Sequence, residues 1–339
     1  GLNANLELRA AREKIANALS CESEEIYFTS GGTEANNLAI LGAAEAGKRK
    51  GKRIVTTAIE HESVLQSVDE LEKQGFEVIR LMPDKQGRIT EQQVFDAVNS
   101  DTILVSMMYV NNEVGSIMPV KSIKKAVKRA NAPALIHIDC VQAFGKLEVK
   151  PSKLGADLVT VTAHKIHGPK GVGALYLKKG TRILPRVFGG EQEKKLRPGT
   201  EAIPLIAGFG VAADLIPDLK KQSEKIKEIN TYAREGLLSV PGVKINSGDD
   251  ASDYIINLFV PTFMTSQTVV QHLSSKYGVY VSNGSACAKG KRSHVLTAMK
   301  LDDKIIEKSI RVSFSRTTTK GDIDEFVNAI KETVVQYPM

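Results

Sequence analysis

The chain has 339 residues, of which 42% are hydrophobic and 25% charged, a composition that allows a large core or two domains and excludes a disordered protein. Its formal net charge is +7, but the lysines are spread along the sequence and no basic run is interleaved with aromatic residues. We therefore expect no direct binding of nucleic acid, and we attribute the charge to solvated helix faces that could also steer an acidic protein partner.

The cysteines argue against two further classes of protein. Cys21, Cys140 and Cys287 are an odd number without CxxC spacing, which argues against a disulfide framework and a zinc site. This usage favours a reducing compartment, so we expect a cytoplasmic protein. No apolar run approaches the length of a membrane span and no secretory signal opens the chain, so no membrane association is expected. Residues 1–5 lead directly into a helical pattern, as if an upstream segment were absent.

Short β-rich runs alternate with helical patterns through the first two thirds of the chain. Helical patterns at 34–50, 63–74 and 120–130 lie between runs that are nearly continuous in apolar residues. Such runs are typical of strands buried on both faces of a mostly parallel sheet. The order predicts an α/β layered domain with right-handed crossovers around a seven-stranded sheet. The predicted strands are 26–29, 54–59, 77–82, 102–109, 135–140, 158–162 and 174–177.

The last third of the chain has a different pattern. A long helical segment runs from about residue 203 to 238 and is broken or bent near Pro217. The shorter runs beyond it are typical of a smaller α+β domain, so we expect a large domain over 1–212 and a small one over 213–339. These runs are 254–260, 268–276, 279–282, 295–299, 310–314 and 323–334.

Polar residues follow several predicted strands, at the position where open α/β sheets bind their ligands. The segment Ser30-Gly31-Gly32-Thr33-Glu34 follows the first strand and opens a helix. Its glycines permit close backbone approach, Thr33 supplies a hydroxyl, and the free N–H groups with the helix dipole favour an anion. The segment is a candidate phosphate site, although an ordinary helix N-cap explains the same residues.

Three further strand ends carry candidate residues. His61 follows strand 54–59 and is either a helix cap or an acid–base group, whereas Asn111 follows strand 102–109 in a segment typical of a turn. Asp139 lies near the end of strand 135–140, where a carboxylate is costly to bury without a cation. That cation is either a core arginine or a protonated pyridine nitrogen, whose ring Asp139 would then hold as an electron sink.

Lys165 follows the apolar strand 158–162 and precedes a glycine-rich bend, GPKGVG from Gly168. A surface lysine at a turn is the ordinary interpretation. The placement also suits a Schiff-base lysine, because the sheet holds the residue, the glycines leave room for a flat ligand and the surroundings keep the amine partly unprotonated. A phosphate turn, an aromatic-ring acid–base candidate, a buried aspartate and a strand-end lysine are together the parts of a pyridoxal phosphate site.

The chain also resembles the cysteine desulfurases of the class V aminotransferase family, which have fold type I among pyridoxal phosphate enzymes. The resemblance covers nearly the whole chain. The motifs that carry it are FTSGGTEANNLAI from Phe28, EHESV from Glu60, NNEVG from Asn111, HIDCVQAFGK from His137, TAHKIHGPKGVGALY from Thr162, RPGTEAIPLIAGF from Arg197, VSNGSACAKGKRSHVL from Val281 and IRVSFSRTTTKGDID from Ile310.

The resemblance implies roles for the matching residues. Lys165 would be the Schiff-base lysine, which also moves a proton at the substrate α-carbon, and Asp139 would be the partner of the pyridine nitrogen. His61 would stack on the cofactor ring and move protons. Arginine binds a carboxylate through two donors, so the pair Asn111 and Arg311 would position the substrate carboxylate. The remaining cofactor contacts are Gln142 to the ring oxygen, and Gly32, Thr33, Thr162 and His164 to the phosphate.

The resemblance also implies a homodimer with shared active sites, in which Thr200 reaches the phosphate of the neighbouring subunit. Cys287 indicates the reaction: it lies in a segment of small residues expected to form an exposed loop, where Lys289, Lys291 and Arg292 favour the thiolate. An incidental surface thiol is the alternative. Together with the resemblance, Cys287 implies conversion of L-cysteine to L-alanine with transfer of sulfur to Cys287 as a persulfide. The sulfur acceptor would be an iron–sulfur scaffold or a tRNA-thiolation enzyme.

Two features depart from the family's pattern. The opening segment with an Asn/Ala-Thr-Thr motif is missing, and the segment between Cys287 and His294 is slightly shorter, which could alter the choice of acceptor. Two alternatives therefore stay open. One is another class V enzyme, such as a selenocysteine lyase or an aminotransferase, and the other is a non-catalytic partner-binding scaffold that has kept the fold.

Overall fold

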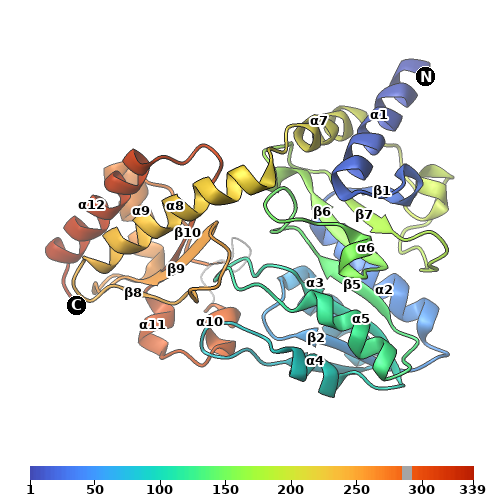
Figure 1. The fold of residues 1–339 in the computed structure, drawn as a ribbon, viewed down its shortest axis with the longest axis horizontal. Helices are drawn as coiled ribbons and strands as arrows, with labels where there is room; N and C mark the ends of the chain where they lie inside the picture. Colours follow the sequence, from blue (N-terminus) through green and yellow to red (C-terminus); the bar gives the residue numbers. More distant parts are fainter. Residues whose placement is uncertain (285–291) are drawn as a thin grey trace. The chain divides into compact units, whose positions relative to one another are not determined.

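The computed structural model describes residues 1–284 and 292–339, which pack into two compact units (Figure 1). Unit 1 consists of Gly1–Leu81, Ile89–Tyr109 and Met118–Leu219, and unit 2 consists of Met82–Arg88, Val110–Ile117 and the described part of Lys220–Met339. The division into domains at residues 212 and 213 stays a prediction. In the structure, however, the two short segments 82–88 and 110–117 pack with the C-terminal part of the chain and not with the rest of the N-terminal part.

Specific contacts hold these two segments within unit 2. The Ser252 N–H donates to the Gly115 carbonyl oxygen at 2.8 Å, and Arg88 forms an ion pair with Asp250 at 2.9 Å. Neither contact is visible in a local sequence pattern, because each joins residues far apart in the chain.

The sheet of unit 1 has seven strands in the order β1-β7-β6-β5-β4-β2-β3. Neighbours from β6 to β3 are parallel, whereas β7 is antiparallel to both β6 and β1. The predicted mostly parallel seven-stranded sheet is confirmed. The strands are β1 (Ile26–Thr29), β2 (Arg53–Thr57), β3 (Glu77–Leu81), β4 (Thr102–Met108), β5 (Leu135–Asp139), β6 (Leu158–Thr162) and β7 (Gly173–Leu177).

The direction of β7 follows from its connection to β6. A parallel neighbour needs a crossover of a dozen or more residues, usually a helix, whereas residues 163–172 contain only the short 3-10 turn Ala163–Lys165. The chain therefore turns back, and Thr162 pairs with Gly173. Gly173 has no room for a side chain, because a Cβ atom there would lie 2.8 Å from the Gly31 Cα atom. The end of β6, the start of β7 and the turn after β1 thus meet closely.

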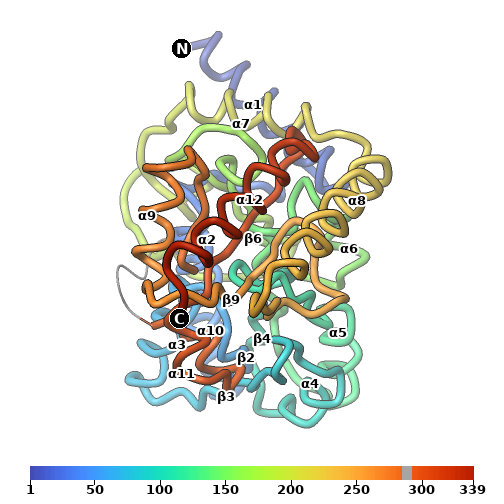
Figure 2. Tube along the Cα trace, turned by 90° about the vertical axis from the view of Figure 1, so that its left-hand side faces the viewer, coloured from blue at the N-terminus to red at the C-terminus, as the bar shows by residue number. Residues whose placement is uncertain are grey.

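Helices pack on both faces of this sheet. In Figure 2, α2 and α3 lie on one side of β2 and β4, and α4 and α5 lie on the other. Small residues of α2, namely Ala35, Ala39 and Ala43, are at most 1% exposed and let the helix approach the sheet closely. The helices of unit 1 are α1 (Leu2–Leu19), α2 (Gly32–Gly47), α3 (Glu62–Lys73), α4 (Glu91–Ala97), α5 (Val120–Arg129), α6 (Pro151–Leu154) and α7 (Ile203–Asp214), with 3-10 turns at Ser23–Glu25, Ala163–Lys165 and Gln192–Lys195.

The predicted break near Pro217 is confirmed, since α7 ends at Asp214 and α8 begins at Leu219, where unit 1 also ends. Unit 2 has a three-stranded antiparallel sheet in the order β10-β9-β8. The predicted smaller α+β arrangement is therefore confirmed. Its elements are α8 (Leu219–Leu238), β8 (Lys244–Ile245), β9 (Ile255–Phe259), α9 (Ser266–Tyr277), α10 (His294–Ala298), α11 (Asp303–Glu307), β10 (Ser309–Ser313) and α12 (Lys320–Gln336).

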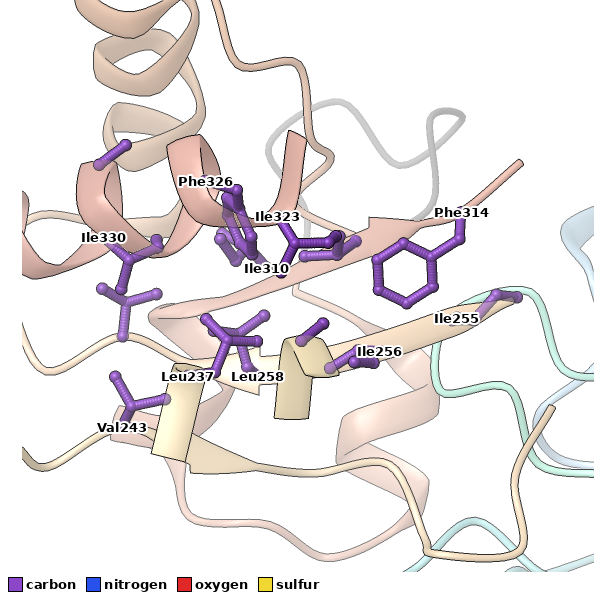
Figure 3. Packing of buried hydrophobic residues seen from close by; sticks show 14 of the residues in the cluster. Leu237, Val243, Ile255, Ile256, Leu258, Ile310, Phe314, Ile323, Phe326 and Ile330 are labelled. Carbon is purple, nitrogen blue, oxygen red and sulfur yellow. The ribbon is translucent and has the colours of Figure 1, made fainter. Parts of the chain in front are cut away.

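Unit 2 has a hydrophobic core of its own. Side chains from α8 and α12 pack with those of β9 and β10, and Figure 3 shows Phe326 and Ile330 of α12 in the same cluster as Ile310, Leu258 and Leu237. Burial of this apolar cluster supplies the main favourable free energy for folding of the unit. Among the described residues, no helix is both long enough and apolar enough to cross a membrane.

Candidate functional site

The candidate cofactor residues all belong to unit 1. All except Thr200, which lies between the 3-10 turn Gln192–Lys195 and α7, are at or just after the carboxyl ends of β1, β2, β5 and β6, which point the same way in the sheet. Parallel strands bring such ends to one edge, where open α/β sheets bind ligands. We call this set the cofactor half-site: Gly32, Thr33, His61, Asp139, Gln142, Thr162, His164, Lys165 and Thr200.

Asp139 is the last residue of β5 and is only 5% exposed. Its Oδ2 atom accepts from the Asn36 side-chain amide at 2.8 Å, and its Oδ1 atom accepts from the Val141 N–H at 2.9 Å. Burial raises the pKa of Asp139, whereas these two donors and then the nearby charges of His61 and Lys165 act in the opposite direction. Among the described residues no arginine pairs with Asp139, so the core-arginine alternative does not account for it.

Thr162, the last residue of β6, and the turn that follows it place Lys165 and His164 in the cofactor half-site. The Thr162 hydroxyl donates to the Val172 carbonyl oxygen at 3.1 Å and also lies 3.1 Å from His164 Nδ1. Because a hydroxyl has one hydrogen, Oγ1 accepts from His164, whose Nδ1 atom therefore carries a proton. Lys165 closes the 3-10 turn that begins at Ala163 and is half-buried. Gln142 lies on the turn after β5, where its Oε1 atom accepts from Lys146 at 3.3 Å.

In the turn after β1, the Ser30 N–H donates to Glu34 Oε2 at 2.6 Å and the Gly31 N–H donates to Thr29 Oγ1 at 3.4 Å. Gly31 is the N-cap of α2 at φ 151° and makes no side-chain cap, and Thr33 in the first turn is exposed. A Cβ atom at Gly32 would lie 2.9 Å from Val141 Cγ2, so this glycine is needed where the turn passes the end of β5. Thr200, the residue predicted to act in the neighbouring subunit, is exposed.

His61 is the N-cap of α3, so the capping interpretation is confirmed. Its Nδ1 atom accepts from the Ser63 N–H at 3.2 Å and lies 2.9 Å from the Ser63 hydroxyl. The acid–base interpretation is compatible with this geometry, because the cap is made through Nδ1 and not through Nε2.

Two buried titratable residues beside the half-site escaped the sequence analysis. His137 is on the same face of β5 as Asp139 and bridges the strands on either side, with Nδ1 2.8 Å from Ser106 Oγ and Nε2 3.0 Å from Thr160 Oγ1. Burial lowers the pKa of His137 to about 3, so this ring is neutral and is not an acid–base group. The signal in the sequence is a histidine within the apolar run of strand 135–140.

Glu60, which directly precedes His61, is completely buried. Its carboxylate accepts from the Met108 N–H at 2.9 and 3.0 Å and from the Thr57 hydroxyl at 2.7 Å, so it ties the end of β2 to the end of β4. Burial raises the pKa of Glu60 to about 8, although these donors oppose the shift. Glu60 is therefore largely protonated near neutral pH.

We expect the free energy of unfolding of the Glu60→Gln variant to fall less steeply with rising pH than that of the wild type. In the wild type the folded-state pKa is about 8 against a usual 4.5, so between these values the folded protein holds a proton that the unfolded chain releases. This contribution is complete below the lower value and is lost as pH rises through the upper one, with a slope of at most about 1.4 kcal/mol per pH unit. Denaturant unfolding across this window measures the slope.

Thr57→Val is the matched control for this prediction. It removes one donor that opposes the raised pKa of Glu60 but leaves the buried carboxyl group, so its stability should fall with the wild-type slope between the two pKa values. Parallel slopes for the wild type and Glu60→Gln would show that Glu60 does not titrate in this window.

The candidate substrate residues belong to unit 2. The Asn111 Oδ1 atom accepts the N–H groups of Glu113 and Val114, each at 2.9 Å, which confirms the predicted turn. Arg311, on β10, donates from Nη1 to the Asn112 carbonyl oxygen at 2.9 Å, so the structure brings the two predicted residues to one place.

Arg311 retains capacity to bind an anion. Its Nε atom is buried without a hydrogen-bond partner, and burial lowers the pKa of its guanidinium, whereas the charge of Glu113 opposes that shift. A desolvated guanidinium with an unused donor is suited to a carboxylate. Glu113, which the sequence analysis did not single out, is 1% exposed and accepts from the Ser293 hydroxyl at 2.5 Å.

Cys287 lies in 285–291, outside the described residues, together with Lys289 and Lys291. The described residues on either side contact Arg311 and Glu113 of unit 2. Ser282 pairs with Arg311 through two backbone hydrogen bonds, and Ser293 contacts Glu113. The other two cysteines are poor nucleophiles, because burial raises the pKa of Cys21 to about 12 and that of Cys140 well above its usual value.

The donors of the cofactor half-site fit pyridoxal phosphate. Asp139 is a buried carboxylate whose described hydrogen bonds come only from neutral groups, which is the environment that a protonated pyridine nitrogen would complete. Lysine, histidine, threonine and glycine residues on the neighbouring strand ends match the aldehyde, ring and phosphate groups of that cofactor.

Comparison with known proteins identifies the same family as the sequence motifs do. The aminotransferase class V model matches residues 1–326. The cysteine desulfurase IscS of Methanosarcina thermophila is 40% identical over 96% of this chain and 81% of its own length. A solved "NifS-like protein" superposes with a TM-score of 0.92 at 35% identity, covering 99% of this chain and 89% of that one.

A second solved structure, described as SspA in complex with cysteine, has a TM-score of 0.80 at 34% identity over 94% of this chain and 89% of that one. Because both the family model and relatives well above 30% identity span nearly the whole chain, this protein belongs to the class V aminotransferase family and, within it, to the cysteine desulfurases.

Proposed function

We propose that this chain converts L-cysteine to L-alanine and takes up the sulfur on Cys287. The observation that carries the proposal is the environment of Asp139, a buried carboxylate with neutral donors at the sheet edge that also carries Lys165. The geometry supports a pyridoxal phosphate site, and the relatives named cysteine desulfurase support the choice of reaction.

When bound, pyridoxal phosphate supplies an electron sink for the substrate α-carbon. Asp139 would keep the ring nitrogen protonated, and Gln142 would contact the ring oxygen. Lys165 would hold the cofactor covalently and then move a proton at the α-carbon, and His61 would stack on the ring and carry a proton to and from the substrate thiol. The phosphate would be held by Gly32, Thr33, Thr162 and His164 and by Thr200 reaching across from the neighbouring subunit.

The substrate carboxylate would be bound by Arg311 and Asn111. The support is the unused, buried Nε donor of Arg311 and its fixed position against the Asn112 carbonyl oxygen. A planar guanidinium can hold both carboxylate oxygens, which would fix the orientation of the amino acid.

Cys287 would act as the nucleophile. Its thiolate would attack the substrate sulfur, the carbon–sulfur bond would break, and the substrate carbon would take a proton. One L-cysteine and one thiol thus give one L-alanine and one persulfide, with all atoms accounted for. The sulfur would pass to an acceptor protein, either an iron–sulfur scaffold or a tRNA-thiolation enzyme.

The proposal includes a homodimer and a reducing, cytoplasmic setting. The setting is supported by Cys21 and Cys140, which are both free thiols. The exposed position of Thr200 supports a role across a subunit interface.

Alanine formation distinguishes this function from its alternatives. Purified protein loaded with pyridoxal phosphate is given L-cysteine without any keto acid, and alanine and sulfide are measured with and without a thiol reductant. With the reductant, which reduces the persulfide, alanine and an equal amount of sulfide are expected; without it, alanine is expected with the sulfur kept on the protein. A requirement for a keto acid would identify an aminotransferase, preference for L-selenocysteine a selenocysteine lyase, and no binding of pyridoxal phosphate a non-catalytic scaffold.

A further inference from the structure

A buried amide links the two cofactor-facing residues Asp139 and His61. Asn36, in the second turn of α2, is 1% exposed. Its Nδ2 atom lies 2.8 Å from Asp139 Oδ2 and 2.9 Å from Ser63 Oγ. An amide nitrogen carries two hydrogens, so Asn36 donates one hydrogen bond to each partner.

The direction of the hydrogen bonds is fixed along the whole chain of contacts. Because Asn36 Nδ2 can only donate, the Ser63 hydroxyl accepts from it. His61 Nδ1 accepts from the Ser63 backbone N–H at 3.2 Å, so the contact of 2.9 Å between Nδ1 and the Ser63 hydroxyl needs the hydroxyl as the donor. An Nδ1 atom that faces two donors is unprotonated, so the proton of the neutral ring is on Nε2.

The oxygen of the Asn36 amide shows why the side chain has this orientation. Asn36 Oδ1 is buried without a hydrogen-bond partner, an arrangement that costs free energy. The reversed amide would place an oxygen 2.8 Å from the Asp139 carboxylate, where the nitrogen now lies, and the two oxygens would repel each other. The charge of Asp139 therefore orients Asn36, and Asn36 in turn donates to the hydroxyl that contacts His61.

We propose that Asn36 is a positioning residue that couples the two cofactor-facing groups, holding Asp139 as a charged acceptor and His61 with its proton on Nε2. The inference rests on the proposed pyridoxal phosphate site. It goes beyond that site because a single amide, which need not touch cofactor or substrate, orients the ring-nitrogen partner and the proton-carrying histidine together.

Three variants test the coupling. Asn36→Leu removes both donors, and Ser63→Ala removes only the branch to His61. Asn37→Ala is the matched control, since Asn37 is the next residue of the same helix and its side-chain amide donates to the Thr33 carbonyl oxygen. The first readout is the dissociation constant of pyridoxal phosphate, titrated into the apoprotein. The second is the ring ¹⁵N spectrum of His61, assigned by comparison with His61→Gln, which reports directly which ring nitrogen is protonated.

Asn36→Leu is expected to weaken cofactor binding about tenfold or more, the value of a hydrogen bond to a charged group, while Ser63→Ala stays within about threefold. In both variants the His61 Nδ1 signal is expected to move toward that of a protonated nitrogen. Asn37→Ala should change neither readout.

An Nδ1 signal that moves in Ser63→Ala but not in Asn36→Leu would overturn the coupling, as would unchanged cofactor affinity in Asn36→Leu. If Asn36→Leu does not fold, the smaller Asn36→Ala removes the same donors and gives the same two readouts. The ¹⁵N spectrum is recorded on the apoprotein, so failure of the wild type to bind pyridoxal phosphate would reject the proposed function separately.

Discussion

Replacing Cys287 with serine is expected to lower sulfide release from L-cysteine on the order of a thousandfold or more, because the attacking thiolate is removed. Binding of pyridoxal phosphate should persist, since all the proposed cofactor residues belong to unit 1. Sulfide assays and the visible absorption spectrum of the same preparation measure the two effects together.

Cys21→Ser is the control for this substitution, because the pKa of Cys21 is raised to about 12 by burial and by nearby glutamates. This variant should release sulfide at the wild-type rate. Full turnover by Cys287→Ser would refute the role of Cys287, and loss of turnover in Cys21→Ser would show that the assay does not isolate one thiol.

Lys165→Ala is expected to remove the covalent link to the cofactor and to reduce alanine formation on the order of a thousandfold or more, since both the link and the proton transfer at the α-carbon depend on this amine. The link is measured by borohydride reduction followed by peptide mass mapping. In the wild type the cofactor mass should appear on the peptide that contains Lys165, and in the variant it should be absent.

Lys170 provides the matched control, because it is an exposed lysine in the same β6–β7 connection. Lys170→Ala should retain the covalent cofactor and most of the activity. If the cofactor mass persisted in Lys165→Ala, or appeared on the Lys170 side chain in the wild type, the assignment of the Schiff-base lysine would be wrong.

The sequence predicted the layered fold well because its strands are short, apolar and separated by polar turns. The runs at 26–29 and 158–162 match β1 and β6 fully, and the break near Pro217 separates α7 from α8. The location of the candidate cofactor residues could also be predicted, since the residues that follow parallel strands lie at one edge of the sheet. Asp139 could be singled out because a carboxylate in an apolar run requires a partner.

Features that depend on distant contacts were not predictable. The segment 110–117 packs in unit 2, because partners such as Ser252 are far away in sequence. The two-residue strand β8 is too short to leave a periodic pattern. Asn36 and Glu60 lie within the quoted motifs, but nothing in the sequence pattern assigns them a role. Their roles follow from the hydrogen bonds that they make to other strands and helices.

In the proposed reaction, sulfur from L-cysteine is transferred to Cys287 and L-alanine is left. Protein loaded with pyridoxal phosphate is mixed with one equivalent of L-cysteine without reductant, and alanine is quantified while the cysteine peptides are mapped by mass spectrometry. We expect close to one alanine per active site and one added sulfur atom on the Cys287 peptide. Alanine without that sulfur, or the added sulfur on Cys21 or Cys140 instead, would contradict the proposed reaction.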